Sequence, residues 1–154
     1  MEHEVIFDEP RQRFIKITLP GFYGNTLRLR SGAVGLAPAT PLEYLDRWAW
    51  SNTLFEDDVR VLGLVNDPAD PRIVVSQPLI VGTRPEREEI VAFMRQLGFQ
   101  PVRDTLLFFD ESRDLLIGDG HPGNFLRNDE GQIFAFDVLP VKATGKLLAF
   151  VLGI

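Results

Sequence analysis

The chain has no cysteine and only two histidines among its 154 residues. A disulfide framework, a thiolate zinc site and a cysteine nucleophile are therefore excluded, and two histidines do not by themselves build a multi-histidine metal centre. Basic residues are also scarce, with 16 lysines and arginines against 22 acids and a net charge of −6. Since nucleic-acid binding depends on cations that neutralise phosphates, this balance argues against a nucleic-acid partner.

Long apolar runs and a basic, apolar leader are missing as well. The N-terminus reads Met1-Glu2-His3-Glu4, and no apolar run reaches the ~20 residues that span a bilayer. We therefore expect a cytoplasmic protein without a membrane partner. A composition of 45% hydrophobic and 25% charged residues is typical of one globular domain with a single core.

The N-terminal part predicts a hairpin followed by an irregular loop. Residues 4–8 and 13–18 are rich in β-branched and aromatic residues, with a turn composition between them. Lys16 is the charged residue within the otherwise apolar second strand. Residues 20–38 carry glycines without a sustained period, which indicates a loop with a short strand at 26–29.

A helix is predicted from Thr40 onward. Thr40 as N-cap, Pro41 at the first helical position and Glu43 three residues after the cap form a capping box. Apolar residues follow at helical spacing. They are Leu42, Leu45, Trp48, Ala49 and Phe55.

The rest of the chain predicts strands around one further helix. That helix begins at Thr83, has Pro85 and Glu86 in its first turn and ends at Gly98. Pro78 marks the end of a strand or an unpaired edge. The predicted strands are residues 59–65, 73–80, 105–109, 114–117, 124–126 and 132–137, with turns at 66–71 and 128–131. The apolar tail, residues 146–154, needs a surface to cover it.

The residues with the clearest chemistry are Asp119, Asn124 and Asp137. An acid, an amide five positions later and a second acid after a hairpin-like segment have the spacing of a phosphoryl-transfer site. Carboxylate and amide oxygens are also the ligands that Mg²⁺ prefers. The alternative is a glycine-rich turn between strands, capped by Asn124, with Asp137 before a loop.

The order of these elements resembles the protein-kinase-like fold, read from its second strand onward. The segment Asp119-Gly-His-Pro-Gly-Asn124 followed by Phe-Asp137 looks like the catalytic loop of aminoglycoside phosphotransferases and choline kinases. Closer still, this loop together with Pro-Leu-Glu-Tyr-Leu at 41–45 and Ser-Gln-Pro at 76–78 resembles the kinase-like domain of phage and mobile-element polyvalent proteins.

The resemblance implies an α+β fold. It would be a reduced protein-kinase-like fold, with an antiparallel sheet, one αC-like helix, a short hinge and a minimal C-terminal lobe. We expect a single domain over residues 1–154, N-lobe-like over 1–80 and C-lobe-like over 81–154, which is either complete or part of a larger protein. A second copy of the chain, or further domains of a larger protein, are the candidate macromolecular partners.

The resemblance also implies an ATP- and Mg²⁺-dependent phosphotransferase whose acceptor is unknown. Asp119 would be the base, Asn124 and Asp137 would complete the catalytic set and bind Mg²⁺, and Lys16 would hold the ATP phosphates. Glu43 is the candidate partner of Lys16, although its place in the capping box already explains it, and Asp46 is its competitor. His121 would orient the loop.

The sequence departs from the kinase pattern in two places, and other functions stay open. No Gly-x-Gly-x-x-Gly loop joins the first two predicted strands, and residues 105–117 are strand-like where kinases have a long helix. The chain is alternatively a degenerate nucleotide-binding or interaction module, a pseudokinase. A further alternative is a metal-dependent hydrolase with Asp119, His121 and Asp137 as ligands. Lys16 alternatively protects and solubilises an edge strand.

Overall fold

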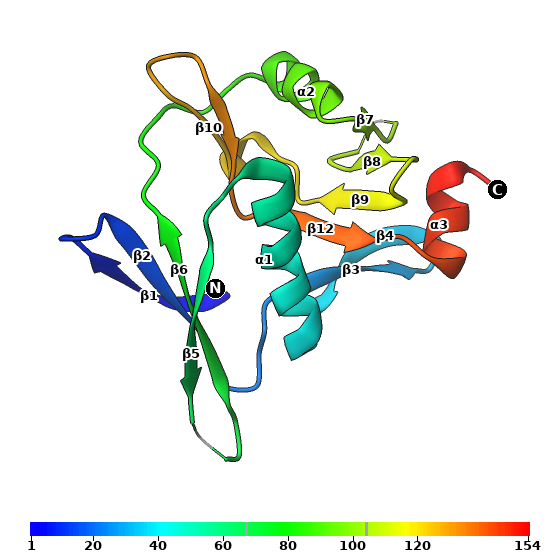
Figure 1. Cartoon of the computed structure of the whole chain (residues 1–154). Coiled ribbons are helices and arrows are strands. Elements are labelled where there is room, and N and C mark those ends of the chain that lie inside the picture. The colour runs from blue at the N-terminus through cyan, green and yellow to red at the C-terminus, as the bar shows by residue number, and fades with distance from the viewer. Residues whose placement is uncertain (67, 104) are drawn as a thin grey trace. The chain divides into compact units, whose positions relative to one another are not determined.

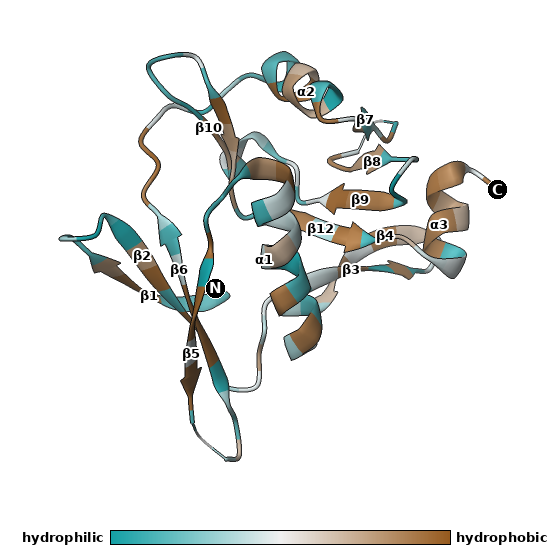
Figure 2. Ribbon diagram, in the orientation of Figure 1, coloured by the Kyte–Doolittle hydropathy of each residue, from teal (hydrophilic) through white to brown (hydrophobic). Residues whose placement is uncertain are grey.

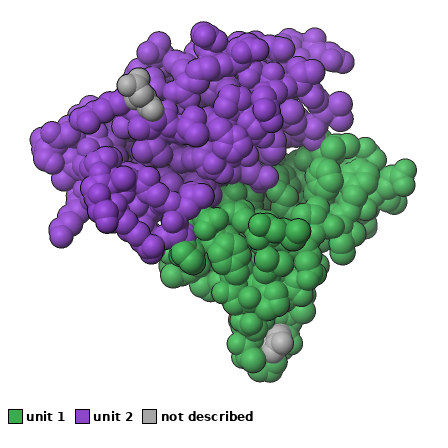
Figure 3. Space-filling view, turned by 180° about the vertical axis from the view of Figure 1, so that it is seen from behind, with its two compact units in different colours: residues 1–26, 38–79 green, residues 27–37, 80–154 purple. Residues whose placement is uncertain are grey.

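The computed structural model describes residues 1–66, 68–103 and 105–154, which divide into two compact units (Figures 1 and 3). Unit 1 consists of residues 1–26 and 38–79, and unit 2 consists of residues 27–37 and 80–154. Each unit has an antiparallel sheet of its own. The predicted turn at 66–71 includes Asp67, which lies outside the described residues.

Unit 1 contains a four-stranded sheet in the order β1-β2-β6-β5. The predicted hairpin is confirmed, since β1 and β2 pair from His3 opposite Thr18 to Asp8 opposite Arg13. The strand that was expected to end at Pro78 does so. The strands are β1 (His3–Asp8), β2 (Arg13–Thr18), β5 (Arg60–Val65) and β6 (Arg72–Pro78).

Helix α1 (Pro41–Phe55) begins as predicted. The Thr40 Oγ1 accepts a hydrogen bond from the Glu43 backbone nitrogen at 3.2 Å, and the Glu43 Oε1 accepts one from the Thr40 nitrogen at 3.0 Å. The capping box is therefore confirmed.

The buried face of α1 differs from the expected one. Leu42 is 67% exposed, whereas Arg47 is buried because its guanidinium pairs with Glu2 at 3.0 Å and stacks on Trp48 at 4.5 Å. Burying a charge becomes tolerable when it is paired in this way. Tyr44 and Trp48 pack with three apolar residues of unit 1, namely Val59, Ile73 and Val75.

Unit 2 contains a four-stranded sheet in the order β12-β9-β8-β7, together with a separate hairpin, β10-β11. The strands of the sheet are β7 (Gln100–Pro101), β8 (Phe108–Asp110), β9 (Leu115–Gly118) and β12 (Leu139–Lys142). The hairpin strands are β10 (Phe125–Arg127) and β11 (Ile133–Ala135), joined by the predicted turn. Neither β7 nor β12 was predicted from the sequence.

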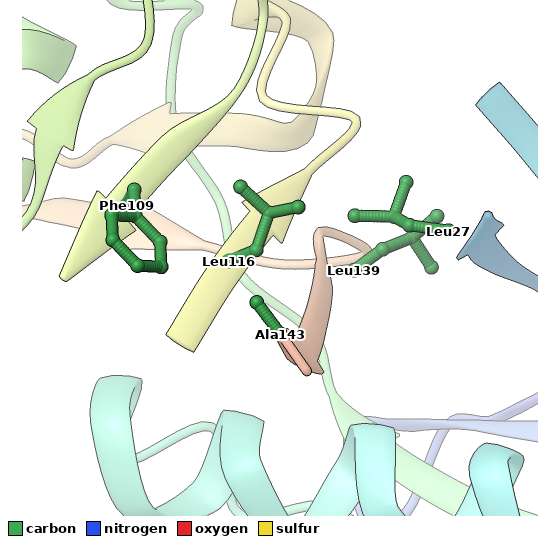
Figure 4. Packing of buried hydrophobic residues seen from close by; sticks show 5 residues of the cluster. All are labelled: Leu27, Phe109, Leu116, Leu139 and Ala143. Carbon is green, nitrogen blue, oxygen red and sulfur yellow. The ribbon is translucent and has the colours of Figure 1, made fainter. Parts of the chain in front are cut away.

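The core of unit 2 joins strands that are far apart in the sequence. Leu27 comes from β3 (Asn25–Arg30), Phe109 from β8, Leu116 from β9 and Leu139 from β12, and these side chains lie together with Ala143 (Figure 4). The apolar tail is helix α3 (Gly145–Leu152), which appears as a hydrophobic element in Figure 2. It covers this core with Leu147, Leu148 and Val151, so the tail finds its surface within the chain.

The short strand expected at 26–29 is confirmed as part of a longer strand, but the rest of the loop expected at 20–38 is wrong from residue 25 onward. Residues 25–38 form a hairpin of β3 (Asn25–Arg30) and β4 (Ala33–Pro38). Ser31 and Gly32 connect the strands and both have positive φ, 51° and 77°, as a two-residue hairpin turn of the mirror-image type requires. Glycine tolerates this conformation at no steric cost, so the glycines of this segment serve a hairpin as well as loops.

The second predicted helix begins later than expected. α2 spans Arg87–Gln96, with Glu86 as its N-cap and Glu89 as the reciprocal capping residue. Thr83 instead pairs with Arg127, because its backbone nitrogen and oxygen bond the Arg127 oxygen and nitrogen at 2.9 and 2.8 Å. These bonds commit the backbone of Thr83 to a bridge and keep it out of the helix.

The molecule is therefore a small α+β protein with antiparallel sheets and, in its described residues, three α-helices. None of the helices in the described part of the chain combines the length and apolarity needed to cross a bilayer.

Candidate functional site

The loop that follows β9 carries the first two predicted site residues. Asp119 comes directly after the strand, and Asn124 ends a single 3-10 turn, Pro122–Asn124, just before β10. Asp119 has a φ of 54°, in the left-handed region that costs a non-glycine residue roughly 1 kcal/mol. The surrounding loop therefore holds this acid in a conformation that it would not adopt freely.

Asn124 fixes the position of Asp119. Its side-chain nitrogen donates to the Asp119 backbone oxygen at 2.7 Å and to the Asp119 Oδ2 at 3.0 Å. Both partners can only accept, so the amide nitrogen must face Asp119 and the amide oxygen must face the other way. Asn124 is 8% exposed, and burial strengthens these bonds.

His121 supports the other oxygen of the same carboxylate. The His121 Nδ1 accepts a hydrogen bond from the Gly123 nitrogen at 3.1 Å, and its Nε2 lies 3.3 Å from the Asp119 Oδ1. An Nδ1 that accepts carries no proton, so the proton of a neutral ring is on Nε2, the nitrogen that lies next to Asp119. The geometry agrees with the orienting role expected for His121.

The three glycines of this loop are explained by close packing. A Cβ on Gly118 would lie 2.5 Å from the Leu27 side chain, and one on Gly120 would lie 2.6 Å from the Leu106 carbonyl oxygen. One on Gly123 would lie 2.8 Å from the His121 ring. Gly118, Gly120 and Gly123 have Gly-x-Gly-x-x-Gly spacing, but they lie after β9 and not between the first two strands. Close packing against Leu27, Leu106 and His121 explains why each of them lacks a side chain.

Asp137 is held next to Asn124 through the backbone. The backbone nitrogen of Phe136, the residue before Asp137, donates to the backbone oxygen of Asn124 at 3.0 Å. The strands β10 and β11 pair directly beyond this bond. Asp137 also has positive φ, 52°. The hairpin therefore brings the two predicted metal ligands to the same end of the ribbon.

The remaining predicted residues, Lys16 and Glu43, belong to unit 1. Lys16 is 8% exposed, and its Nζ lies 5.5 Å from the centre of the Trp48 ring. The edge-strand interpretation of Lys16 is wrong, because β2 pairs with β1 on one side and β6 on the other. A lysine in an inner strand does not protect a sheet edge.

Glu43 lies at the first turn of α1 and fills the capping box, as the sequence indicated. Its carboxylate is therefore held in place by the Thr40 backbone. Asp46, the competing candidate, is an exposed residue of the same helix.

The hydrolase interpretation finds no support in the site. Asp119 and His121 are paired, but within residues 1–66, 68–103 and 105–154 no three histidine, cysteine or acidic side chains cluster as a metal site. The set Asp119, His121 and Asp137 therefore does not form the ligand sphere that this interpretation requires.

The sequence analysis missed a pocket beside Asp119 in unit 2. It has a volume of about 360 Å³ and Asp119 forms part of its wall. The β3-β4 hairpin supplies half of the residues that line this pocket. Because most of residues 20–38 was expected to form a loop, the pocket could not be predicted from the sequence. The detectable signal was the alternation of Thr26 to Arg30 followed by a Ser-Gly turn.

Comparison with known proteins gives one family. The model of a family described as "Serine/Threonine/Tyrosine Kinase found in polyvalent proteins" matches residues 35–141. No curated protein and no solved structure matches the chain.

Proposed function

Because this chain belongs to the family of serine/threonine/tyrosine kinases found in polyvalent proteins, we propose that it transfers the γ-phosphoryl group of ATP to a hydroxyl acceptor. In this proposal Asp119 acts on the acceptor hydroxyl. Asn124 and Asp137 bind the metal, and Lys16 binds the ATP phosphates.

The observation that carries the proposal is the pairing of Asp119 with Asn124. The Asp119 Oδ2 accepts a hydrogen bond from the Asn124 amide, and the Asp119 Oδ1 lies 3.3 Å from the His121 Nε2. A general base must be held within hydrogen-bond reach of the proton that it receives. The loop supplies such an acid, and its side chain remains 36% exposed and thus accessible to an acceptor.

The reaction assigned to Asp119 is a single proton transfer coupled to phosphoryl transfer. The acceptor oxygen bonds the γ-phosphorus as the bond from that phosphorus to the β,γ-bridging oxygen breaks, and ADP leaves. The acceptor proton passes to Asp119. Such a base contributes about 10²- to 10⁴-fold to the rate. The hydrogen bond from Asn124 and the contact with His121 keep the carboxylate directed while it acts.

The oxygens of Asn124 and Asp137 fit a magnesium ion. Since the Asn124 nitrogen is committed to Asp119, its amide oxygen is the atom that faces a cation, and Asp137 adds a carboxylate. Hard oxygen donors of this kind suit Mg²⁺, which keeps several waters and binds one or two protein groups plus phosphates. When bound, Mg²⁺ would neutralise charge on the β and γ phosphates.

Lys16 and Glu43 complete the assignment from unit 1. Lys16 is a buried lysine beside Trp48, and its ammonium group is a flexible point charge of the kind that binds phosphates. Glu43, fixed at the start of α1, is assigned to orient Lys16. This corresponds to the lysine–helix glutamate pair of protein kinases.

The proposal includes the fold that the family implies. The β1-β2-β6-β5 sheet with α1 would be a reduced N-terminal lobe, with α1 as the αC-like helix. Residues 79–86 would be the hinge, and the strands and helices after it would form a minimal C-terminal lobe. The element order along the chain supports this assignment.

One observation favours the degenerate alternative, a kinase-like module that binds nucleotide or a partner without transferring phosphate. The β1-β2 connection is the tight turn Glu9-Pro10-Arg11-Gln12, which contains no glycine. A kinase covers the phosphates with a glycine-rich loop between two strands, and this turn does not have that composition.

ATP turnover with a matched pair of variants tests the proposal. Asp119→Asn removes the base without changing the size of the side chain, and Asp129→Asn alters an exposed acid of the β10-β11 turn as the control. ADP release by Asp119→Asn should fall about 10²- to 10⁴-fold. Asp129→Asn should behave as the natural protein does.

Thermal unfolding with and without MgATP separates the two functions. A ligand that binds only the folded state raises the melting temperature. Stabilisation with turnover lost in Asp119→Asn supports the kinase. Stabilisation without turnover in the natural protein supports the degenerate module, and no stabilisation by any nucleotide contradicts both as nucleotide-binding functions.

A further inference from the structure

The pocket beside Asp119 lies wholly within unit 2. Its walls come from the β3-β4 hairpin, from the loop before β8, from α3 and from Asp119 itself. Its volume of about 360 Å³ falls in the roughly 300–1,000 Å³ range of small-molecule sites. The lining residues other than Asp119 are Leu27, Ala33, Val34, Gly35, Leu36, Thr105, Leu106, Leu107 and Phe150.

Two packing contacts tie the walls of this pocket to the catalytic loop. The Gly120 nitrogen donates to the Leu106 carbonyl oxygen at 3.1 Å, at a place where a Cβ on Gly120 would not fit. Leu27 fills the space that a Gly118 side chain would need. Because Asp119 lies between these two glycines, the same contacts fix the position of the candidate base relative to the wall of the pocket.

The chemistry of the lining restricts what the pocket can bind. Among the residues that the structure describes, Asp119 is the single ionisable group on its wall, so no lysine or arginine is present to bind an anion. The Thr105 hydroxyl is used internally, since it donates to the Val102 oxygen and accepts from the Leu107 nitrogen at 3.1 Å. The remaining lining side chains are apolar or absent.

A cationic ligand is also poorly served. The carboxylate of Asp119 already accepts a hydrogen bond from Asn124, and its other oxygen lies 3.3 Å from the His121 ring. Desolvating an ammonium group among apolar walls with one shared carboxylate is unfavourable. A neutral body with a hydroxyl that reaches Asp119 satisfies the site best.

We propose that this pocket binds the phosphate acceptor and that the acceptor is a neutral phenol, an uncharged aromatic body carrying the hydroxyl that is phosphorylated. This inference rests on the proposed function. The aromatic body would pack on Leu36, Leu106 and Phe150 while its hydroxyl donates to Asp119. The phenol oxygen then bonds the γ-phosphorus of ATP, ADP leaves, and the proton goes to Asp119. A tyrosine side chain and a free phenolic compound share this chemistry.

Three phenols of similar size and different charge test the pocket in the absence of nucleotide. They are 4-ethylphenol, which is neutral, tyramine, which is cationic, and 4-hydroxyphenylacetate, which is anionic. Ligand-observed NMR measures the binding of each to the full chain. We expect the neutral phenol to bind about tenfold or more tightly than either ion, because burying a charge without a partner costs more than 1.4 kcal/mol. N-acetyl-tyrosinamide and a neutral tyrosine peptide distinguish a peptide source from a free compound.

Two variants locate the binding. Leu36→Glu places a charge in the pocket, and Leu62→Glu is the matched control, since these leucines are 52% and 55% exposed and Leu62 lies in β5 of unit 1. Leu36→Glu should weaken 4-ethylphenol binding about tenfold or more, and Leu62→Glu should not change it. Phe150→Lys, at another wall, should repeat the loss, and thermal unfolding verifies that each variant is folded.

The outcomes separate this inference from the proposed function. Equal binding of the three phenols, or no effect of Leu36→Glu and Phe150→Lys, overturns the acceptor assignment even if MgATP still stabilises the protein and is turned over. Phenol binding by a protein that MgATP does not stabilise overturns the acceptor role together with the kinase. Neutral-selective binding lost in both variants, with MgATP turnover present and phosphate recovered on the phenol, supports it.

Discussion

Asn124 illustrates at the scale of one residue how the site depends on a buried amide. Its side chain holds both the backbone and the carboxylate of Asp119, so the same contacts stabilise the loop and orient the acid that we propose as the base. The sequence predicted Asn124 by its spacing from Asp119. Spacing alone could not show that the amide nitrogen faces Asp119, because a side-chain direction follows from the folded loop.

Replacing Asn124 should therefore destabilise the fold as well as the site. We expect Asn124→Ala to lower the free energy of unfolding by about 1–3 kcal/mol, since it leaves the Asp119 carbonyl without its donor in a largely buried loop. Gln96→Ala, at an exposed position at the end of α2, is the control and should stay within about 0.5 kcal/mol. Denaturant unfolding measures both, and an Asn124→Ala as stable as the natural protein would refute this role.

Asp110 provides the pH dependence expected of unit 2. Burial acts to raise the pKa of Asp110, but hydrogen bonds from Ser112 and Arg113 outweigh burial and hold the pKa below its usual range. The unfolded chain therefore binds a proton more readily than the folded one. The stabilisation is complete above the unfolded pKa of about 3.9 and is lost as the pH falls through the lowered value.

Asp110→Asn should remove this contribution. The variant should be less stable at pH 7, and its free energy of unfolding should fall less steeply between about pH 5 and pH 3 than that of the natural protein. Urea unfolding at several pH values measures the two slopes. Parallel slopes would show that Asp110 does not have a lowered pKa in the folded state.

At the scale of helices and strands, the sequence predicted the boundaries that depend on residues close together in the chain. The capping box at Thr40 and the strand end at Pro78 depend on neighbouring residues alone, and both are confirmed. The start of α2 was wrong because Thr83 is held by Arg127, a residue distant in sequence. The short strand predicted at 26–29 lies in β3, but its partner β4 was missed because the glycines of this segment suggested a loop, and a pairing strand cannot be inferred from composition alone.

A mutation can test the close contact between Leu27 of β3 and Gly118 at the end of β9. Gly118→Ala should cost about 1–3 kcal/mol, since its Cβ would lie 2.5 Å from the Leu27 side chain. Gly35→Ala, in β4, is the control because nothing lies within 4 Å of a Cβ there. In a double-mutant cycle, Leu27→Ala should reduce the cost of Gly118→Ala. Independent effects of the two changes would contradict the close packing.

At the scale of the whole molecule, the residues that we propose for binding ATP and Mg²⁺ are distributed over both units. Lys16 and Glu43 come from unit 1, and Asp119, Asn124 and Asp137 come from unit 2. The sequence suggested this set through a resemblance that covers the order of elements. The pocket beside Asp119 could not be predicted in the same way, because it joins the β3-β4 hairpin, the 105–107 loop and α3, which only the folded chain brings together.

The most direct test of the central claim is calorimetric titration of ATP, with and without Mg²⁺, into the natural protein, Lys16→Met and Asp137→Asn. Charge-assisted bonds are worth about 1.5–3 kcal/mol, so we expect Lys16→Met to weaken ATP binding about tenfold or more. We expect Asp137→Asn to remove the gain in affinity that Mg²⁺ gives. Unchanged affinity in both folded variants, or no ATP binding by the natural protein, would contradict the account.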